Sequence, residues 1–317
     1  MNIDIYMPRL DVSFKRGLVP KVRGKIPALR EYWKLFCLRL KEFYIHSGHN
    51  ARIIEAPLWQ ITEDLVRQKS ENAQKIFIPH KMKLNWRLDD RVFYYMQMVV
   101  PSIFSIDTEG WCASTSFWPI QFNKRASPRV FKILEERISR NISKFPQPSA
   151  KESLNLPDKY IFFPCQIPYD ETISFHSDIG VSQALEVVLE WMISYPSDYS
   201  LVIKGHPVNY SAMEPLKKVY LDFLKGLEDN SQLNRFIWLD KVSIHQVLAS
   251  SDAVITVNSG VGIEAILHQK KVLTFGNADY STIAHKIMYG GSLDTAVQNL
   301  NKTISIAEDI DSLTYKQ

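Results

Sequence analysis

The sequence predicts an α/β fold of two Rossmann-like domains with parallel sheets, facing each other across a cleft. In the second half of the chain, short apolar runs of strand length alternate with segments whose apolar residues have helical spacing. Such alternation is typical of βαβ units on a parallel sheet. A Pro- and Ser-rich stretch at Phe145–Pro157 has the composition of a linker. We therefore expect one domain at residues 1–150 and a second at residues 151–317.

The second domain is predicted from its apolar runs, one element after another. Strands are expected where aliphatic and aromatic residues gather, at Tyr160–Pro164, Ser200–Lys204, Arg235–Leu239, Ala253–Val257 and Lys271–Phe275. Helices are expected between them, at Ser182–Ser194, Met213–Leu227, Ile244–Ala249 and Val261–Leu267. Because ligands bind parallel sheets at the carboxyl ends of the strands, polar residues that directly follow a strand are candidates for a site.

The first domain has a looser pattern. Strands are expected at Ile3–Tyr6, Ala51–Glu55, Lys75–Ile78 and Ile103–Ile106. Helices are expected at Ile26–Tyr44 and Asp89–Met98. These segments indicate a second α/β domain, less regular than the C-terminal one.

Composition and cysteine usage exclude several classes of protein. The chain has 317 residues, 45% hydrophobic and 23% charged, with a formal net charge of +4, so it can bury two ordinary cores and has no charge bias toward nucleic acid. Its three cysteines lack metal-type or redox-type spacing. No run reaches the roughly 18 apolar residues of a membrane span, and the N-terminus lacks a signal-peptide core. We expect a cytoplasmic protein that, at a membrane, would lie on the surface.

A first candidate phosphate site follows the expected strand Ser200–Lys204. In Lys204-Gly205-His206-Pro207, glycine lets the chain turn and proline stops the strand. Lysine and histidine side chains there can donate hydrogen bonds to phosphate oxygens. Taken alone, the motif is equally typical of a strand-ending turn whose histidine only caps its neighbours.

A second candidate follows the expected strand Ala253–Val257. Asn258, Ser259 and Gly260 form a turn that opens a helix, where free amides and the serine hydroxyl can bind an anion. Glu264 lies one helical turn further on, where its carboxylate can accept hydrogen bonds from ribose hydroxyls. Taken alone, this pattern favours a tight turn with an N-cap serine. Two phosphate-type turns at successive strand ends strengthen the functional interpretation of both.

An amide and three carboxylates complete the candidates. Gln166 and Asp170 follow the strand Tyr160–Pro164, where the amide could bind a base or sugar edge and the carboxylate could act as nucleophile or base at a sugar carbon. Asp107 and Glu109 end a strand of the first domain, and one of them could be a general acid or base. An ordinary turn aspartate and solvated loop acids are equally compatible with these positions.

Several motifs of other enzyme classes are missing from the sequence. It contains no Walker-type phosphate loop, GxGxxG, zinc-type Cys/His spacing or GxSxG elbow, and no DxD metal motif follows an expected strand. We therefore expect no metal ion and no cofactor. His245 and His268 fall in expected helices, and we interpret them as surface or capping residues.

Together these motifs resemble the bacterial capsule polysaccharide synthesis family, which contains β-Kdo transferases. The resemblance is carried by Gln166-x-Pro168, by the His206-Pro207 turn, and by VNSGVGIEAILHQKKVLTFGNADY at Val257–Tyr280. It extends over Tyr160–Tyr280 and reaches the first half only through Glu109-Gly110-Trp111. The histidine–proline turn by itself is also found in sialyltransferases and CDP-glycerol phosphotransferases.

The resemblance implies a GT-B-like fold whose C-terminal domain binds a CMP-Kdo donor. His206 and Ser259 would bind the CMP phosphate, and Glu264 the ribose. The full set of donor-binding positions is Gln166, Lys204, His206, Pro207, Asn258, Ser259, Gly260 and Glu264. Asp170 matches the nucleophile of a retaining double displacement, and Glu109 or Asp107 matches the acid/base carboxylate. A single phosphate can be neutralised by lysine, histidine and backbone amides without a metal.

The resemblance also implies partners: a CMP-activated sugar, a lipid-linked or oligosaccharide acceptor, and capsule assembly proteins. A basic stretch at Lys15–Lys41 accompanies an aromatic helix face, which is typical either of a solvated helix or of a surface that binds the anionic inner membrane. Two alternative functions stay open. One is another CMP- or CDP-dependent transferase, moving sialic acid or glycerol phosphate, and the other is a non-catalytic nucleotide-sugar-binding subunit.

Overall fold

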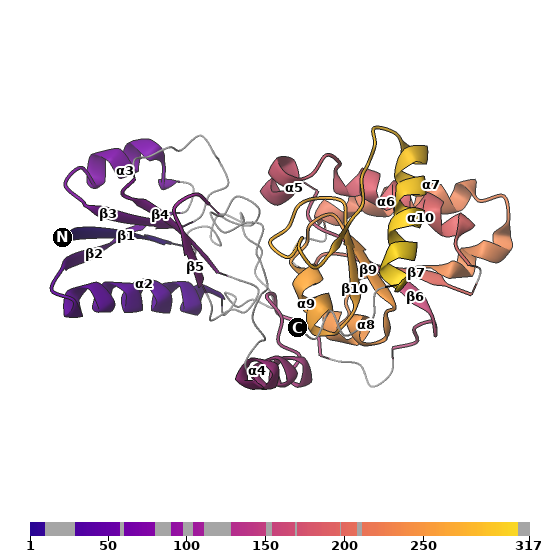
Figure 1. The fold of residues 1–317 in the computed structure, drawn as a ribbon, viewed down its shortest axis with the longest axis horizontal. Coiled ribbons are helices and arrows are strands. Elements are labelled where there is room, and N and C mark those ends of the chain that lie inside the picture. Colours follow the sequence, from indigo (N-terminus) through magenta and orange to yellow (C-terminus); the bar gives the residue numbers. More distant parts are fainter. Residues whose placement is uncertain are drawn as a thin grey trace. The chain divides into compact units, whose positions relative to one another are not determined.

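The structure, a computed structural model, describes residues 1–9, 29–57, 60–79, 90–97, 104–110, 128–149, 154–168, 170–196, 198–207 and 211–309. It divides into two compact units, Met1–Trp118 and Pro119–Gln317 (Figure 1). This division lies earlier in the chain than the boundary expected at residues 150/151.

Hydrogen bonds explain why the units divide before the Pro- and Ser-rich stretch. Helix α4 (Pro128–Ser139) is followed by a segment that is tied to the second unit. Ser243 Oγ donates to Asn141 Oδ1, and Ile244 N donates to Gln147 Oε1 at 2.9 Å. The residues that we expected to form a linker therefore begin as part of the second unit.

The first unit is a five-stranded sheet in the order β2-β1-β3-β4-β5. The strands are β1 (Asn2–Pro8), β2 (Asn50–Ala56), β3 (Lys75–Pro79), β4 (Val92–Gln97) and β5 (Phe104–Asp107). All neighbours pair in parallel except β4 and β5, which are antiparallel. Thus four strands give the expected parallel arrangement, and an antiparallel strand closes one edge.

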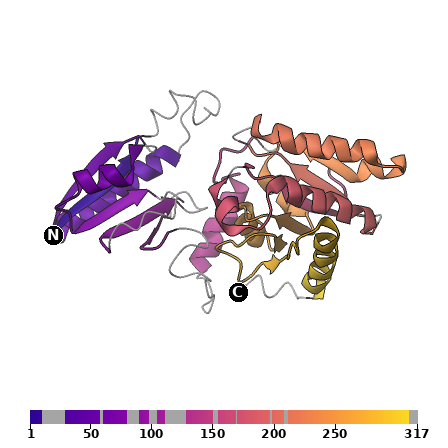
Figure 2. The ribbon, with the colours of Figure 1, turned by 90° about the horizontal axis from the view of Figure 1, so that it is seen from above.

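Helices cover both faces of this sheet, as Figures 1 and 2 show. Helix α2 (Leu29–His46) packs on the face that presents Ile3, Ile5 and Phe77, with Cys37 at its centre. On the other face, α3 (Glu63–Lys69) buries Val66 in the cluster of Tyr6, Ile76 and Ile78. Because side chains of a strand alternate between faces, each strand contributes to both cores.

One expected element of this unit is wrong. The segment Asp89–Met98 was expected to be a helix, whereas its described part contains β4. Val92, Tyr95 and Gln97 are buried in the sheet beside β3. Short apolar runs fit helix and strand equally well by periodicity, and here the β-branched and aromatic residues pack on a pleated surface.

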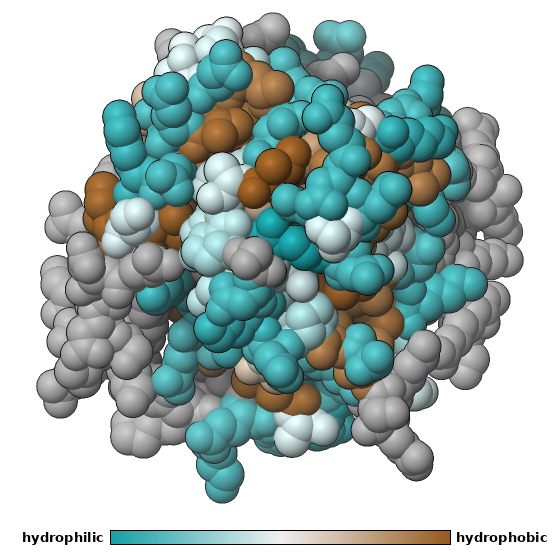
Figure 3. All heavy atoms as spheres, turned by 90° about the vertical axis from the view of Figure 1, so that its right-hand side faces the viewer, coloured by the Kyte–Doolittle hydropathy of each residue, from teal (hydrophilic) through white to brown (hydrophobic). Residues whose placement is uncertain are grey.

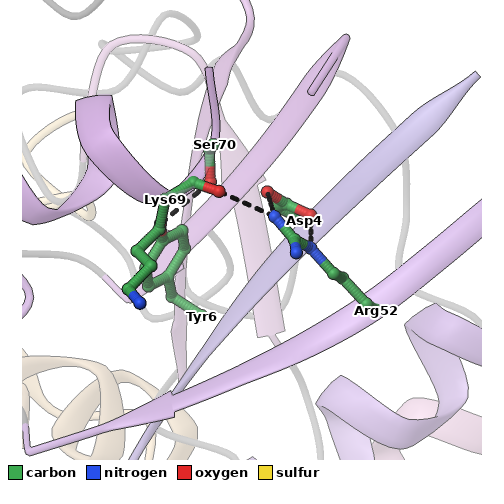
Figure 4. Close-up of polar contacts among 5 residues, drawn as sticks. All are labelled: Asp4, Tyr6, Arg52, Lys69 and Ser70. Carbon is green, nitrogen blue, oxygen red and sulfur yellow. Dashed lines mark hydrogen bonds and ion pairs between the residues drawn. The ribbon is translucent and has the colours of Figure 1, made fainter. Parts of the chain in front are cut away.

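A cross-strand ion pair links β1 and β2 near the amino ends of the strands (Figure 4). Arg52 donates from Nε to Asp4 Oδ1 at 2.6 Å and from Nη2 to Oδ2 at 3.0 Å. The same Nη2 donates to the carbonyl oxygen of Lys69 at 2.7 Å, which ties the end of α3 to the sheet. Asp4 and Arg52 are register partners, so the bidentate pair supports this strand alignment.

The second unit is a six-stranded, entirely parallel sheet in the order β11-β10-β9-β6-β7-β8. The strands are β6 (Tyr160–Pro164), β7 (Ser200–Lys204), β8 (Phe236–Leu239), β9 (Ala253–Thr256), β10 (Lys271–Thr274) and β11 (His285–Lys286). The five longer strands all match expected ones. The predicted Rossmann-like α/β class is therefore confirmed in this unit.

Two layers of helices enclose this sheet (Figures 1 and 2). One face packs against α6 (Val181–Ser194), α7 (Glu214–Gly226) and α10 (Leu293–Asp309), through residues such as Phe163 and Trp191. The other face packs against α8 (Ile244–Ser250) and α9 (Val261–Leu267), through residues such as Phe162. The short α5 (Glu171–His176) follows β6.

One face of the molecule is predominantly polar (Figure 3). On the side that Figure 3 shows, hydrophilic residues dominate and hydrophobic residues form small, separate patches. Among the described helices, none combines the length and the apolar character needed to cross a membrane.

Candidate functional site

The strand order of the second unit reverses between β6 and β9. From β6 the chain moves outward through β7 to β8, whereas from β9 it moves outward in the opposite direction through β10 to β11. The loops after β6 and β9 therefore diverge at the carboxyl edge of the sheet. In open α/β sheets, such a reversal is where ligands bind.

Gln166 and Asn258 bridge this point. Gln166 Nε2 donates to Asn258 Oδ1 at 2.9 Å, and Asn258 N donates to Gln166 Oε1 at 2.9 Å. The two residues are 5% and 4% exposed, so their amides are held in fixed orientations with little contact with solvent. The structure thus brings together two predicted donor-site residues that are far apart in the sequence.

Asp170 is tied to the same network through Thr172. Asp170 Oδ1 accepts hydrogen bonds from Thr172 N and Thr172 Oγ1, both at 2.9 Å. Asn258 Nδ2 donates to the carbonyl oxygen of Thr172 at 2.8 Å. Asp170 is the N-cap of α5, so the turn-aspartate interpretation is correct as a structural role, and the carboxylate also lies beside the strand reversal.

Lys204 and His206 lie at the carboxyl end of β7, the strand next to β6. Lys204 is 3% exposed, and burial lowers its pKa to about 8. Burial, together with the positive charge of Lys204, lowers the pKa of His206 to about 4, while Asp170 acts in the opposite direction. His206 is therefore neutral at pH 7, and Lys204 carries the positive charge at this strand end.

The turn after β9 is held by its own hydrogen bonds. Ser259 Oγ accepts from Val261 N at 3.2 Å, and Tyr280 Oη donates to the Ser259 carbonyl oxygen. Gly260 is the N-cap residue of α9, with helical φ and ψ. A Cβ on Gly262 would lie 2.3 Å from the Tyr280 ring, so glycine is required for this packing. The expected serine contact at the start of α9 is thus present, although the N-cap residue is Gly260 and not Ser259.

Glu264 is a buried carboxylate in the same helix. It is 5% exposed, and among the described residues its Oε1 has no hydrogen-bond partner. Burial raises the pKa of its carboxyl group, while a hydrogen bond from Ser143 and the charges of His245 and Lys144 lower it. A buried oxygen without a partner is costly, which makes it a candidate for a ligand contact.

The candidate acids of the first unit have different environments. Asp107 is buried, and its Oδ1 accepts hydrogen bonds from Glu109 N at 2.7 Å and from Gly110 N at 3.2 Å. It therefore shapes the turn after β5. Glu109 has an exposed side chain. Trp111 lies outside the described residues.

Two residues of the second unit were missed or misjudged from the sequence. Thr172 connects Asp170 to Asn258, and the Asp-x-Thr spacing of an N-cap turn was the signal for it. His245 is buried rather than at the surface, since its Nδ1 contacts His268 Nε2 at 3.0 Å and its Nε2 contacts a backbone carbonyl oxygen. His268 is the C-cap of α9, as expected.

No group of three or more His, Cys, Asp or Glu side chains suited to a metal ion occurs in the described part of the chain. The carboxyl edge offers instead a neutral imidazole, a buried ammonium group and amide groups. These are hydrogen-bond donors for an anion and for polar groups of a base or sugar.

Residues 130–284 match the model of a family described as "Capsule polysaccharide biosynthesis protein". The matched region is just under half of the chain. The matched region contains the strand reversal and every candidate residue of the second unit. It confirms the resemblance that the sequence motifs indicated.

Curated relatives agree with this family. The chain is 29% identical over 130 residues to the capsule polysaccharide export protein KpsS of Escherichia coli, covering 39% of this chain and 32% of that protein. It is 23% identical over 125 residues to the capsule polysaccharide modification protein LipB of Neisseria meningitidis, covering 38% and 29%. The match thus spans about a third of the length of these relatives.

Two solved structures align with this chain at low sequence identity. A KpsC β-Kdo 2,7 transferase from Thermosulfurimonas dismutans aligns with a TM-score of 0.48 and 17% identity, covering 94% of this chain and 89% of the other. A UDP-GlcNAc 2-epimerase from Methanocaldococcus jannaschii aligns with a TM-score of 0.42 and 10% identity, covering 98% and 94%.

Proposed function

We propose that this protein is a glycosyltransferase of capsular or surface polysaccharide synthesis that transfers Kdo from CMP-Kdo to a lipid-linked or saccharide acceptor. The observation that carries the proposal is the convergence of Gln166, Asn258 and Asp170 at the strand reversal of a family-typical unit. A nucleotide-sugar donor is the class of ligand that such an edge, with a neighbouring lysine and histidine, can bind.

The donor would be held by charge and by hydrogen bonds. Lys204 supplies positive charge for the single phosphate of CMP, and neutral His206 supplies an N–H donor. The Ser259 hydroxyl can add a further hydrogen bond. Glu264 Oε1, which has no partner among the described residues, can accept from a ribose hydroxyl. Because these groups neutralise one phosphate, we propose that the reaction needs no metal and no cofactor.

The transfer reaction would proceed by a double displacement. The Asp170 carboxylate forms a bond to the anomeric carbon while the bond from that carbon to the CMP phosphate oxygen breaks, and CMP leaves with the electron pair. An acceptor hydroxyl, deprotonated by Glu109 or Asp107, then attacks the same carbon and releases Asp170. Two inversions give net retention. The exposed side chain favours Glu109 for this role over Asp107.

A donor screen tests this proposal. The protein is incubated with CMP-Kdo, CMP-sialic acid, and CDP-glycerol, each with candidate acceptors, and released CMP is measured together with glycosylated product. CMP release and product with CMP-Kdo, and a Kdo adduct on the peptide that contains Asp170, are expected. Turnover with another donor alone would identify a different CMP- or CDP-dependent transferase. Binding of CMP without turnover of any donor would favour a non-catalytic subunit.

A further inference from the structure

The segment after α4 folds over the candidate donor site of the second unit. Asn141 and Gln147 accept hydrogen bonds from Ser243 and Ile244 N, and the Ile142 carbonyl oxygen contacts His245 Nε2 at 3.0 Å. These contacts fix both ends of a short segment whose middle contains Lys144 and Phe145. The segment is thus an integral part of the second unit and not a free linker.

Phe145 places this segment against His206. The two rings lie 5.1 Å apart between centroids, edge to face at 72°. Lys144 Nζ lies 5.7 Å from the centroid of the Phe145 ring. The ammonium group of Lys144, the aromatic ring and the imidazole at the end of β7 therefore form one contiguous group.

The charge of Lys144 changes the pKa values of three residues that follow strands of the second unit. It lowers the pKa of His206, where burial is the main cause of the downward shift. It also opposes the increase in pKa that burial produces in Glu264 and Asp279. These residues follow β7, β9 and β10, which agrees with the position of Lys144 beside Phe145, whose ring contacts His206 at the carboxyl end of β7.

We propose that Lys144 is a further phosphate-binding residue of the donor site, brought there by the segment Asn141–Gln147. The inference rests on the proposed function and adds to it. His206 is neutral at pH 7, so it can donate a hydrogen bond but cannot balance the phosphate charge. Lys204 lies at the strand end, and Lys144 reaches the phosphate from the overlying segment. The ligand class is a nucleoside monophosphate or its sugar ester.

Titration of the full chain with CMP and with cytidine tests the assignment. The Lys144→Met variant is expected to bind CMP about tenfold more weakly than wild type, because one charge-assisted hydrogen bond is lost. Cytidine, which lacks the phosphate, should bind both proteins equally. Lys144→Arg should keep CMP affinity within about threefold. The matched control is Lys302→Met on the exposed surface of α10, which should leave both affinities unchanged.

A second measurement needs no variant. Acetylation of wild-type lysines is followed by mass spectrometry, and CMP is expected to protect Lys144 while cytidine does not and Lys302 is unaffected. If wild type binds CMP but Lys144→Met binds it equally well and CMP gives no protection, the inference is wrong while the donor site stands. An equal loss of CMP and cytidine binding would assign Lys144 a structural role. Failure of wild type to bind CMP would overturn the proposed function as well.

Discussion

Gln166 and Asn258 exchange two hydrogen bonds across the point where the strand order of the second unit reverses. Each residue uses its amide oxygen and either its amide nitrogen or its backbone nitrogen, so the loops after β6 and β9 are locked together. The proposed nucleotide-sugar site at this edge depends on these two hydrogen bonds.

Replacing Gln166 with Leu should destabilise the second unit. The change leaves Asn258 N and Oδ1 without these partners in a buried environment, at a cost of about 1–3 kcal/mol. Urea unfolding followed by circular dichroism measures the effect. The control Gln298→Leu lies on the exposed surface of α10 and should change stability by less than about 0.5 kcal/mol. Equal stability of the two variants would contradict the importance of the bridge.

Replacing Asp170 with Asn should abolish transfer without unfolding α5. Asparagine caps helices as well as aspartate does, but it is a much poorer nucleophile, so we expect activity to fall by about a thousandfold or more. The released CMP is measured with CMP-Kdo as donor.

The chain provides a matched control for that substitution. Asp229 also caps a helical turn and accepts hydrogen bonds from Ser231 N and Ser231 Oγ, in the same Asp-x-Ser/Thr arrangement. Asp229→Asn should retain activity, and both variants should keep the unfolding midpoint of wild type. Full activity of the Asp170→Asn variant would show that Asp170 is not the nucleophile.

Stability should decrease as the pH falls below about 6.5. Burial, with the nearby charge of Lys204, lowers the pKa of His206 from 6.5 to about 4 in the folded state. Between these values the unfolded chain binds a proton that the folded chain does not, so the stabilisation is present above pH 6.5 and is lost as the pH falls toward 4.

Thermal unfolding at pH 7 and at pH 5 measures this dependence, in a range where most carboxylates stay ionised. We expect a smaller decrease in the unfolding midpoint for His206→Asn than for wild type, because asparagine takes up no proton. An identical decrease in both proteins would show that His206 does not contribute.

Helix α2 should bind membranes that contain anionic lipid. Its exposed apolar side chains include Leu35, Phe43 and Ile45, at 50%, 62% and 48% exposure, and Lys34 and Arg39 are exposed on the same helix. Apolar and basic residues together suit an interfacial helix, which agrees with a lipid-linked acceptor.

Sedimentation with vesicles of phosphatidylcholine, with and without phosphatidylglycerol, checks this expectation. Wild type should sediment with the anionic vesicles and less so at high salt. The double substitution Phe43→Ser and Ile45→Ser should weaken binding several-fold, whereas Met288→Ser, at a 57% exposed position of the second unit, should not. If wild type does not bind the anionic vesicles, the exposed face of α2 is simply a solvated helix face.

The parallel sheet of the second unit was predictable because its strands are short apolar runs separated by helix-forming segments. The predicted Tyr160–Pro164 and Ser200–Lys204 match β6 and β7. Helix α10 was not predicted, although its buried residues Ala296, Leu300 and Ile304 recur at helical spacing. In the first unit, the helix predicted at Asp89–Met98 was wrong because a run of aromatic and aliphatic residues does not distinguish a helix from a strand such as β4.

The candidate site was predictable only where a polar residue directly follows a strand. That rule found Gln166, His206 and Asn258, which adjacent parallel strands bring to one edge. It could not find Thr172 or Lys144, since their proximity to the site arises from the folding of loops and not from position after a strand. The buried state of His245 likewise depends on contacts with a distant segment.

The hydrogen bonds from Asn141 and Gln147 also determine where the chain can be cut. A fragment that starts at residue 151, the domain boundary expected from the sequence, would lack both acceptors, leaving Ser243 Oγ and Ile244 N at the start of α8 without them. It would also expose the face of His206 that Phe145 covers. A C-terminal fragment intended to fold independently therefore has to begin upstream of Asn141.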